Sequence, residues 1–147
     1  MTKLLVAIAV LQTGLPLFAA EPVDYERQIK PVLKARCYSC HGGLKQESGL
    51  RLDTGILLRK GGDSGAGLVA RHPGESLILE RIAHQDESQR MPPEGKPLSA
   101  GQIELIRHWI AEGATSPADE RPEEDPAAHW AFRIPVRHEL PAVRRSE

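Results

Sequence analysis

The stretch that decides the fold is Cys37-Tyr38-Ser39-Cys40-His41-Gly42. It holds both cysteines of the chain, three positions apart, with a histidine directly after the second. Upstream, Asp24 is a helix N-cap, and apolar residues at 3–4 spacing predict a helix that starts near Tyr25 and runs straight into the motif. Pro31 is expected to kink or shorten this helix, and the glycine pair after His41 to end it.

Cys-X-X-Cys-His is the attachment signature of a c-type haem. Two thiols on one helical turn can each form a thioether with one vinyl group of the same porphyrin, and His41 then projects towards the iron as proximal ligand. The motif predicts one covalently attached haem c on Cys37 and Cys40. A large, mostly apolar haem would also fill an interior for which the chain has little material, since aromatic residues make up only 4 % of it.

Three other uses of the cysteines stay open. A Cys37–Cys40 disulfide would close a very short loop, for which the stabilisation is smallest. A zinc site would need a fourth ligand, and the histidines available lack a zinc-knuckle spacing: His72, His84 and His108. A thioredoxin-like pair would normally follow a strand and open a helix, whereas this pair closes one.

A distal iron ligand is the next candidate. Met91 is the only methionine besides Met1, and it lies in a proline-flanked loop before the last predicted helix. Such a loop can hold a thioether rigidly against the far face of the iron, and Met/His ligation raises the reduction potential. The alternatives are that Met91 fills a gap in the core, or that His84 or His72 is the ligand.

Three more helical segments are expected after the motif. Residues 44–74 form mostly loop, with a short helix over 54–60, and a second helix starts near 73–76 with Leu77, Ile78 and Ile82 as its buried side. The last helix has a capping box of Ser99 and Gln102 and ends at Gly113. Its apolar residues are expected to pack against the first helix: Ile103, Leu105, Ile106, Trp109 and Ile110.

Residues 1–20 are predicted to be a secretory signal peptide. Lys3 precedes an apolar run over 4–11, and Ala19-Ala20 offers small residues for cleavage. The run is shorter than the roughly 20 residues of a membrane span. The mature protein is therefore expected to be periplasmic or secreted, and to meet a membrane only if this segment stays uncleaved. A buried core helix is the alternative.

Net charge and composition argue against nucleic-acid binding and divide the chain after residue 20 into a haem domain and a tail. The net charge is -1, so there is no basic footprint for nucleic acid. Residues 21–114 are predicted to form the haem domain. From residue 115 to 147 the chain is rich in proline and acids and is predicted to be a flexible linker or tail without a packed core.

Taken together, these motifs resemble the planctomycete-type cytochrome c domain. The matching stretches lie at 29–33, 37–42, 48–53, 61–65, 75–78, 91–93, 96–99 and 109–114. The resemblance implies an all-α, class I-like cytochrome c fold with long loops around one haem. It also implies attachment at Cys37 and Cys40, with His41 proximal and Met91 distal. The pair Arg71-His72 is more charged than expected there, which leaves the local loop contacts in doubt.

The tail after residue 128 resembles the connector that precedes large domains in longer family members. Whether the chain is a truncated gene, a fragment or a free-standing carrier stays open. The leading function is an electron carrier or electron-entry domain with redox protein partners, and not an enzyme. The alternatives are a haem-based sensor with an open iron position, a peroxidase, which usually needs a second haem or a distal acid–base set, and a purely structural or zinc-binding domain.

Overall fold

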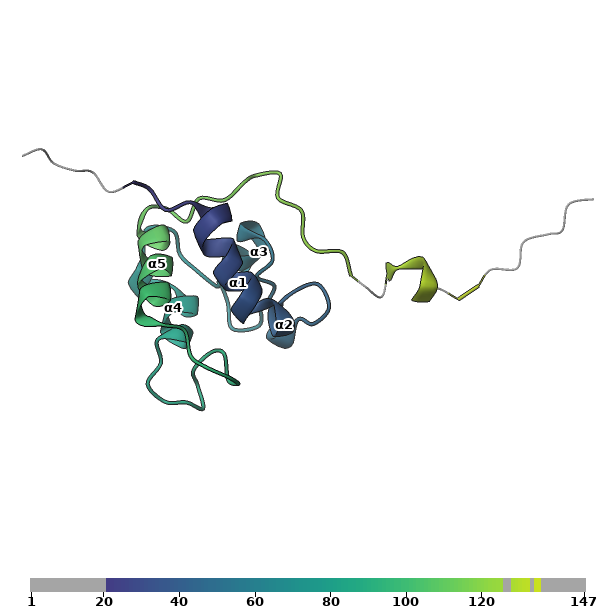
Figure 1. Ribbon diagram of the computed structural model, residues 1–147, viewed down its shortest axis with the longest axis horizontal. Coiled ribbons are helices and arrows are strands. Elements are labelled where there is room, and N and C mark those ends of the chain that lie inside the picture. Colours follow the sequence, from purple (N-terminus) through teal and green to yellow (C-terminus); the bar gives the residue numbers. More distant parts are fainter. Residues whose placement is uncertain (1–20, 126–127, 133, 136–147) are drawn as a thin grey trace, which may run out of the picture.

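The computed structural model describes residues 21–125, 128–132 and 134–135, so the predicted signal peptide lies outside the described residues. Over these residues short helices are joined by long loops, and two isolated β-bridges occur in place of strands (Figure 1). The predicted all-α class is confirmed for this part of the chain. The elements are η1 (Tyr25–Ile29), α1 (Lys30–Arg36), α2 (Tyr38–His41), η2 (Glu47–Gly49), α3 (Gly55–Lys60), η3 (Pro73–Glu75), α4 (Leu77–Ile82), α5 (Ala100–Ala111) and η5 (Trp130–Phe132). None of the helices in the described ranges is long and apolar enough to cross a membrane.

The first predicted helix is present but is divided into segments. Asp24 caps it as predicted, because its Oδ1 accepts a hydrogen bond from the Arg27 N–H at 3.0 Å. The first five residues form the π-helix η1, and α1 follows with Pro31 in its first turn, where a missing N–H is tolerated. The backbone leaves helical geometry again at Cys37 (φ -126°, ψ -33°). The motif therefore lies on the separate helix α2, not on the end of one continuous helix.

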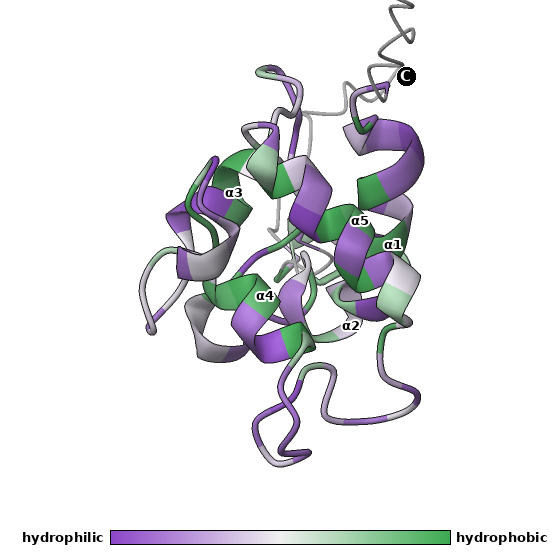
Figure 2. Ribbon diagram, turned by 90° about the vertical axis from the view of Figure 1, so that its left-hand side faces the viewer, coloured by the Kyte–Doolittle hydropathy of each residue, from purple (hydrophilic) through white to green (hydrophobic). Residues whose placement is uncertain are grey.

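The core lies between the first and last helices and includes Ile29, Leu33, Ile106, Trp109 and Ile110, all of which are buried. The ring of Trp109 stacks on Tyr25 of η1 with 5.4 Å between ring centroids, which confirms the predicted packing of the last helix against the first. Figure 2 shows hydrophobic segments on each of α1, α3, α4 and α5, whereas the loop after α4 is mostly hydrophilic. Burying a large apolar side chain contributes about 1.5–3 kcal/mol, so this contact contributes substantially to the stability of the domain.

The later helices begin and end where local signals predict. The Ser99 Oγ accepts from the Gln102 N–H at 3.2 Å, and the Gln102 Oε1 accepts from the Ser99 N–H at 2.9 Å, which completes the capping box of α5. Gly113 follows α5 with φ of +109°, a conformation that favours glycine. In α4 the buried side is Ile78, Leu79 and Ile82. Leu77, which was also predicted on this side, is only half-buried and lines the cavity described below together with Ile78 and Ile82.

The chain after α5 differs from the flexible tail predicted from residue 115. Residues 114–124 run across the domain next to α1 and α3 (Figure 1), and several of them bond to it. The prediction failed because it treated the acidic residues here as solvated, whereas Glu120 is almost fully buried in an ion pair with Lys30. Further on, Trp130 and Phe132 are exposed, and η5 lies apart from the domain.

Candidate functional site

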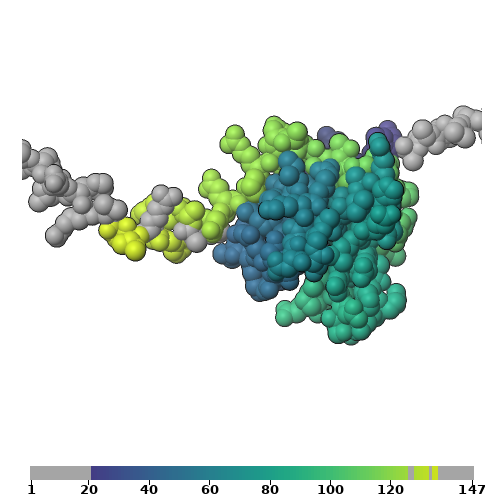
Figure 3. Space-filling model, turned by 180° about the vertical axis from the view of Figure 1, so that it is seen from behind, coloured from purple at the N-terminus to yellow at the C-terminus, as the bar shows by residue number. Residues whose placement is uncertain are grey.

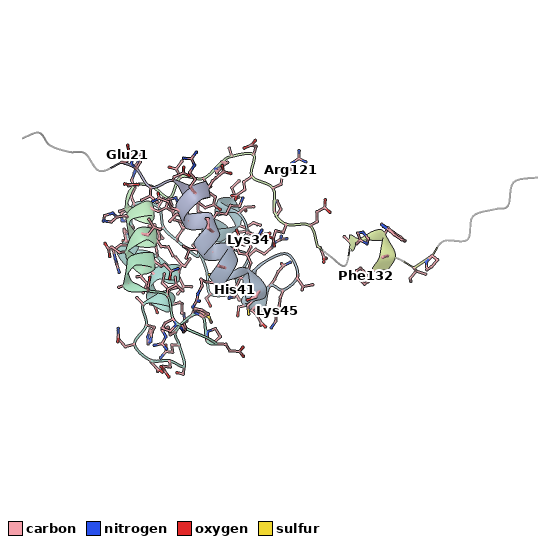
Figure 4. All side chains as sticks on the ribbon, viewed as in Figure 1. Glu21, Lys34, His41, Lys45, Arg121 and Phe132 are labelled. Carbon is pink, nitrogen blue, oxygen red and sulfur yellow. The ribbon has the colours of Figure 1, made fainter. Side chains whose placement is uncertain are left out.

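The candidate site is built on the turn that joins α1 to α2. The carbonyl of Cys37 accepts hydrogen bonds from the N–H groups of Cys40 (3.1 Å) and His41 (2.8 Å). These bonds close a single turn and bring the two cysteines and the histidine close together. Both thiols are free rather than joined in a disulfide. Figure 4 shows His41 at the lower end of α1, with Lys45 next to it on the loop that follows α2.

The turn opens onto a cavity of about 780 Å³. All four residues predicted to bind the cofactor line it: Cys37, Cys40, His41 and Met91. Much of the remaining wall is apolar and comes from segments far apart in the sequence: Leu50, Leu52, Leu58, Leu77, Ile78 and Ile82. A concave, largely apolar cavity with a few convergent polar groups is the usual form of a cofactor site.

Met91 reaches the cavity from the loop between α4 and α5. Its N–H donates to the carbonyl of Arg81 at 2.9 Å, which fixes the loop against the end of α4. The residue is 37 % exposed and lines the cavity wall. It is therefore not a gap-filling residue of the buried core, which was the alternative in the sequence.

The rival histidines are not among the residues that line the cavity, and each pairs with a sequence neighbour. The His84 Nδ1 accepts from the Asp86 N–H at 3.1 Å. His72 lies 3.6 Å from Glu75, and His108 lies 3.6 Å from Glu104. Within the described ranges, no group of three or more His, Cys, Asp or Glu side chains is placed to hold a metal ion. None of these histidines therefore joins the two thiols in a zinc site.

The electrostatics of the turn favour the neutral form of the Cys37 thiol. Burial raises the pKa of Cys37 to about 11, against an ordinary value of 9.0, and the neighbouring Arg36 only partly opposes this shift. At neutral pH the Cys37 thiol stays protonated, whereas thiol–disulfide exchange uses the thiolate. The Nδ1 of His41 is buried and has no hydrogen-bond partner within the described residues. An unsatisfied buried nitrogen of this kind calls for an explanation, and a bound group is one.

These residues fit a c-type haem. Two thiols, an imidazole and a thioether converge on a largely apolar cavity, and these are the groups that covalent attachment and Met/His ligation need. Four cationic side chains also line the cavity, namely Arg36, Lys45, Arg81 and Lys96. Their charges suit the carboxylate groups that a haem carries. No spacing rule could have found them, because they become neighbours only through the fold.

Comparison with known families finds a match to part of the chain. The sequence model described as Planctomycete cytochrome C matches residues 37–95, which include the two cysteines, His41 and Met91. Searches of curated proteins and of solved structures found no match. The matched residues supply the attachment turn, much of the cavity wall and the loop that carries Met91. Residues 37–95 of this chain are therefore similar in sequence to the planctomycete cytochrome c family, and they hold the haem motif and Met91.

Proposed function

We propose that this protein is an electron carrier, or the electron-entry domain of a larger protein, and that it works outside the cytoplasm with one covalent haem c. The observation that carries the proposal is the cavity on which both thiols, His41 and Met91 converge. Cys37 and Cys40 would hold the haem as thioethers, with His41 as proximal and Met91 as distal ligand. When bound, the haem supplies a one-electron ferric/ferrous couple.

The ligand set favours electron transfer over catalysis at the iron. With His41 and Met91 both bound, no coordination position is open to a substrate or a gas. Electron transfer needs no such position, because electrons pass through the haem edge. The thioether of Met91 favours ferrous iron, and the apolar wall limits access of water to the site. Redox proteins are the partners that this chemistry requires.

Covalent attachment is the first test. The protein is matured in a host that has c-type haem machinery and is then extracted with acidified organic solvent. The colour should stay with the polypeptide, at one haem per chain. The double variant Cys37→Ser/Cys40→Ser is the control and should release all of its colour. Haem that washes out of the unaltered protein, or zinc in its place, would refute the proposal.

The distal ligand separates a carrier from a sensor. The unaltered ferrous protein should bind carbon monoxide poorly near neutral pH. Met91→Ala should open the iron to carbon monoxide and lower the reduction potential, because a thioether stabilises ferrous iron. His84→Ala is the matched control and should change neither property. If the unaltered protein binds carbon monoxide readily, or if Met91→Ala changes neither property, the carrier assignment with Met91 as ligand fails. Ready binding by the unaltered protein would favour a haem-based sensor, whereas a larger effect of His84→Ala would assign the distal position to His84.

Export can be tested on the same material. Cleavage near Ala20 should give a mature protein whose N-terminal sequence starts at or near Glu21. Recovery from the periplasm or the medium would agree with that result. A mature chain that still starts at Met1 would instead favour an uncleaved membrane anchor.

A further inference from the structure

The chain that follows α5 crosses the domain next to α1 and α3 before it leads away towards η5 (Figure 1). We name residues 114–124 the C-terminal strap. It starts where the Trp109 Nε1–H donates to the carbonyl of Thr115 at 2.9 Å. It continues past Ser116, whose Oγ accepts from Arg59 at 3.4 Å. The space-filling view (Figure 3) shows this yellow-green segment running along the body of the domain before it departs. The strap lies outside the matched residues 37–95.

Glu120 is the main anchor of the strap. Its side chain is only 3 % exposed, and its carboxylate lies 2.7 Å from the Lys30 Nζ on α1. The same carboxylate accepts from the Tyr25 hydroxyl at 3.0 Å and from the Gly55 N–H at 2.8 Å. One carboxylate therefore joins η1, α1 and α3. A carboxylate with this little exposure is tolerated only when donors satisfy it, so this placement is specific.

A second anchor lies nearer to the attachment turn. The Glu123 N–H donates to the Asp53 Oδ2 at 2.8 Å, and the Glu123 carbonyl accepts from the Arg51 Nη2 at 2.9 Å. The strap then passes so close to Gly43 that a Cβ on this glycine would lie 3.1 Å from the Cβ of Glu123. Gly43 lies two residues after His41, so the strap covers the end of the haem motif.

The anchors connect to His41 through the backbone. The Leu52 N–H donates to the His41 carbonyl at 2.8 Å, and Leu52 directly precedes Asp53. Tyr38, which lies inside the motif, has a buried side chain. Its pKa is raised mainly by burial and, to a smaller extent, by the charge of the nearby Glu120. Any displacement of the strap is therefore passed to the turn that carries both thiols and the proximal ligand.

We infer that the C-terminal strap is part of the haem-binding unit, and that Glu120 is a positioning residue that holds the turn Cys37–His41 against the cavity. The inference rests on the proposed function, since it concerns the haem that this turn would carry. Glu120 touches no predicted iron ligand. It acts through α1, α3 and the neighbouring anchor at Asp53, all of which pack around the turn.

The test uses the full-length haem protein and the variant Glu120→Gln. Loss of a negative charge alone favours ferrous iron and raises the reduction potential. A loosened turn lets water reach the site, which favours ferric iron and lowers the potential. We expect Glu120→Gln to lower the potential and to increase several-fold the affinity of ferric iron for added imidazole. The matched control is Asp119→Asn, which replaces the exposed acid directly before Glu120. This variant should neither lower the reduction potential nor increase the affinity for imidazole.

Two further comparisons do not depend on Glu120. A Cβ at Gly55 would lie 2.2 Å from the Ser116 Oγ, so Gly55→Ala should displace the strap and reproduce the effect of Glu120→Gln. Gly74→Ala, which meets nothing within 4 Å, is its control. A chain that ends after Asp125 should match the full-length protein, whereas one that ends after Ser116 should show the lowered potential.

The outcomes distinguish this inference from the proposed function. If the unaltered chain carries covalent haem but Glu120→Gln shifts the potential upward, as Asp119→Asn does, then Glu120 acts only as a charge and the inference is wrong. The same holds if truncation after Ser116 changes nothing. A chain without covalent haem refutes the proposed function itself. The potential and the imidazole affinity are measured under conditions in which far-UV circular dichroism shows that each variant is fully folded. A general loss of stability then cannot account for a change in either quantity.

Discussion

Replacement of Asp53 by asparagine is the most direct test of how the domain is held together. The Asp53 side chain is fully buried and accepts three hydrogen bonds, two from the Arg51 guanidinium and one from the Glu123 N–H. Asparagine has the same shape but offers one acceptor atom and one donor group. Its amide nitrogen must therefore face an Arg51 donor, and the Arg51 charge, which is 19 % exposed, loses its partner.

The expected loss is about 3 kcal/mol in the free energy of unfolding. A hydrogen bond to a charged group contributes about 1.5–3 kcal/mol, and breaking a buried ion pair costs about 3–5 kcal/mol. The lower part of that range applies, because Arg51 can turn towards solvent. For a domain of this size, about 3 kcal/mol corresponds to a melting temperature lower by roughly 12–24 °C.

The assay is guanidinium unfolding of the haem protein, followed by far-UV circular dichroism. The midpoint of Asp53→Asn should fall by about 0.5–1.5 M, at slopes of about 2–6 kcal/mol/M. Arg51→Met and the double variant complete a cycle, in which the double variant should be more stable than the sum of the single losses predicts. A loss below about 1 kcal/mol for Asp53→Asn, or simple additivity in the cycle, would show that this pair is not a structural unit.

Three more predictions follow from the fold. Burial raises the pKa of Tyr25 and Tyr38 above the ordinary value of 10.0, so their contribution to stability is complete below pH 10 and is lost as the pH rises further. Ultraviolet titration should therefore show tyrosinate only together with unfolding. Titration of either tyrosine near pH 10 in the folded protein would contradict this prediction. Ser99→Ala should lower stability by about 1 kcal/mol by removing the N-cap of α5, while Ser99→Asp retains it, as urea unfolding can measure. Trp109→Phe should cost about 2–3 kcal/mol, because it removes the bond to Thr115 and leaves a small cavity, and circular dichroism would detect the lowered midpoint.

Local signals in the sequence predicted the helices well. The capping box at Ser99 and Gln102 and the N-cap at Asp24 act over three or four residues, so they can be read without knowledge of the fold. The Cys-X-X-Cys-His motif is local in the same sense. Met91 lies fifty positions after His41 (91 minus 41), so no local spacing joins it to the motif; its place in a proline-flanked loop suggested it as a ligand, and the family resemblance supported that choice.

The contacts of the strap could not be predicted in this way. The partners of Glu120 are Lys30, Tyr25 and Gly55, and the hydrogen bonds to the last two span 95 and 65 positions. An acid in a proline-rich stretch is usually solvated, and nothing in its neighbours indicates otherwise. The division of the chain at residue 114 was drawn from composition, which reports the average character of a segment and not the placement of one carboxylate.

The position of Glu120 also decides which piece of this chain can be moved as one module. The similarity to the family ends at residue 95, and the last long helix ends at Ala111. A fusion or domain exchange cut at either point would leave Lys30, Tyr25 and the Gly55 N–H without the carboxylate that joins them. A transplantable unit therefore has to include Tyr25 through Glu120 to keep each of these donors satisfied from within, and it has to reach Glu123 to keep the bonds to Asp53 and Arg51.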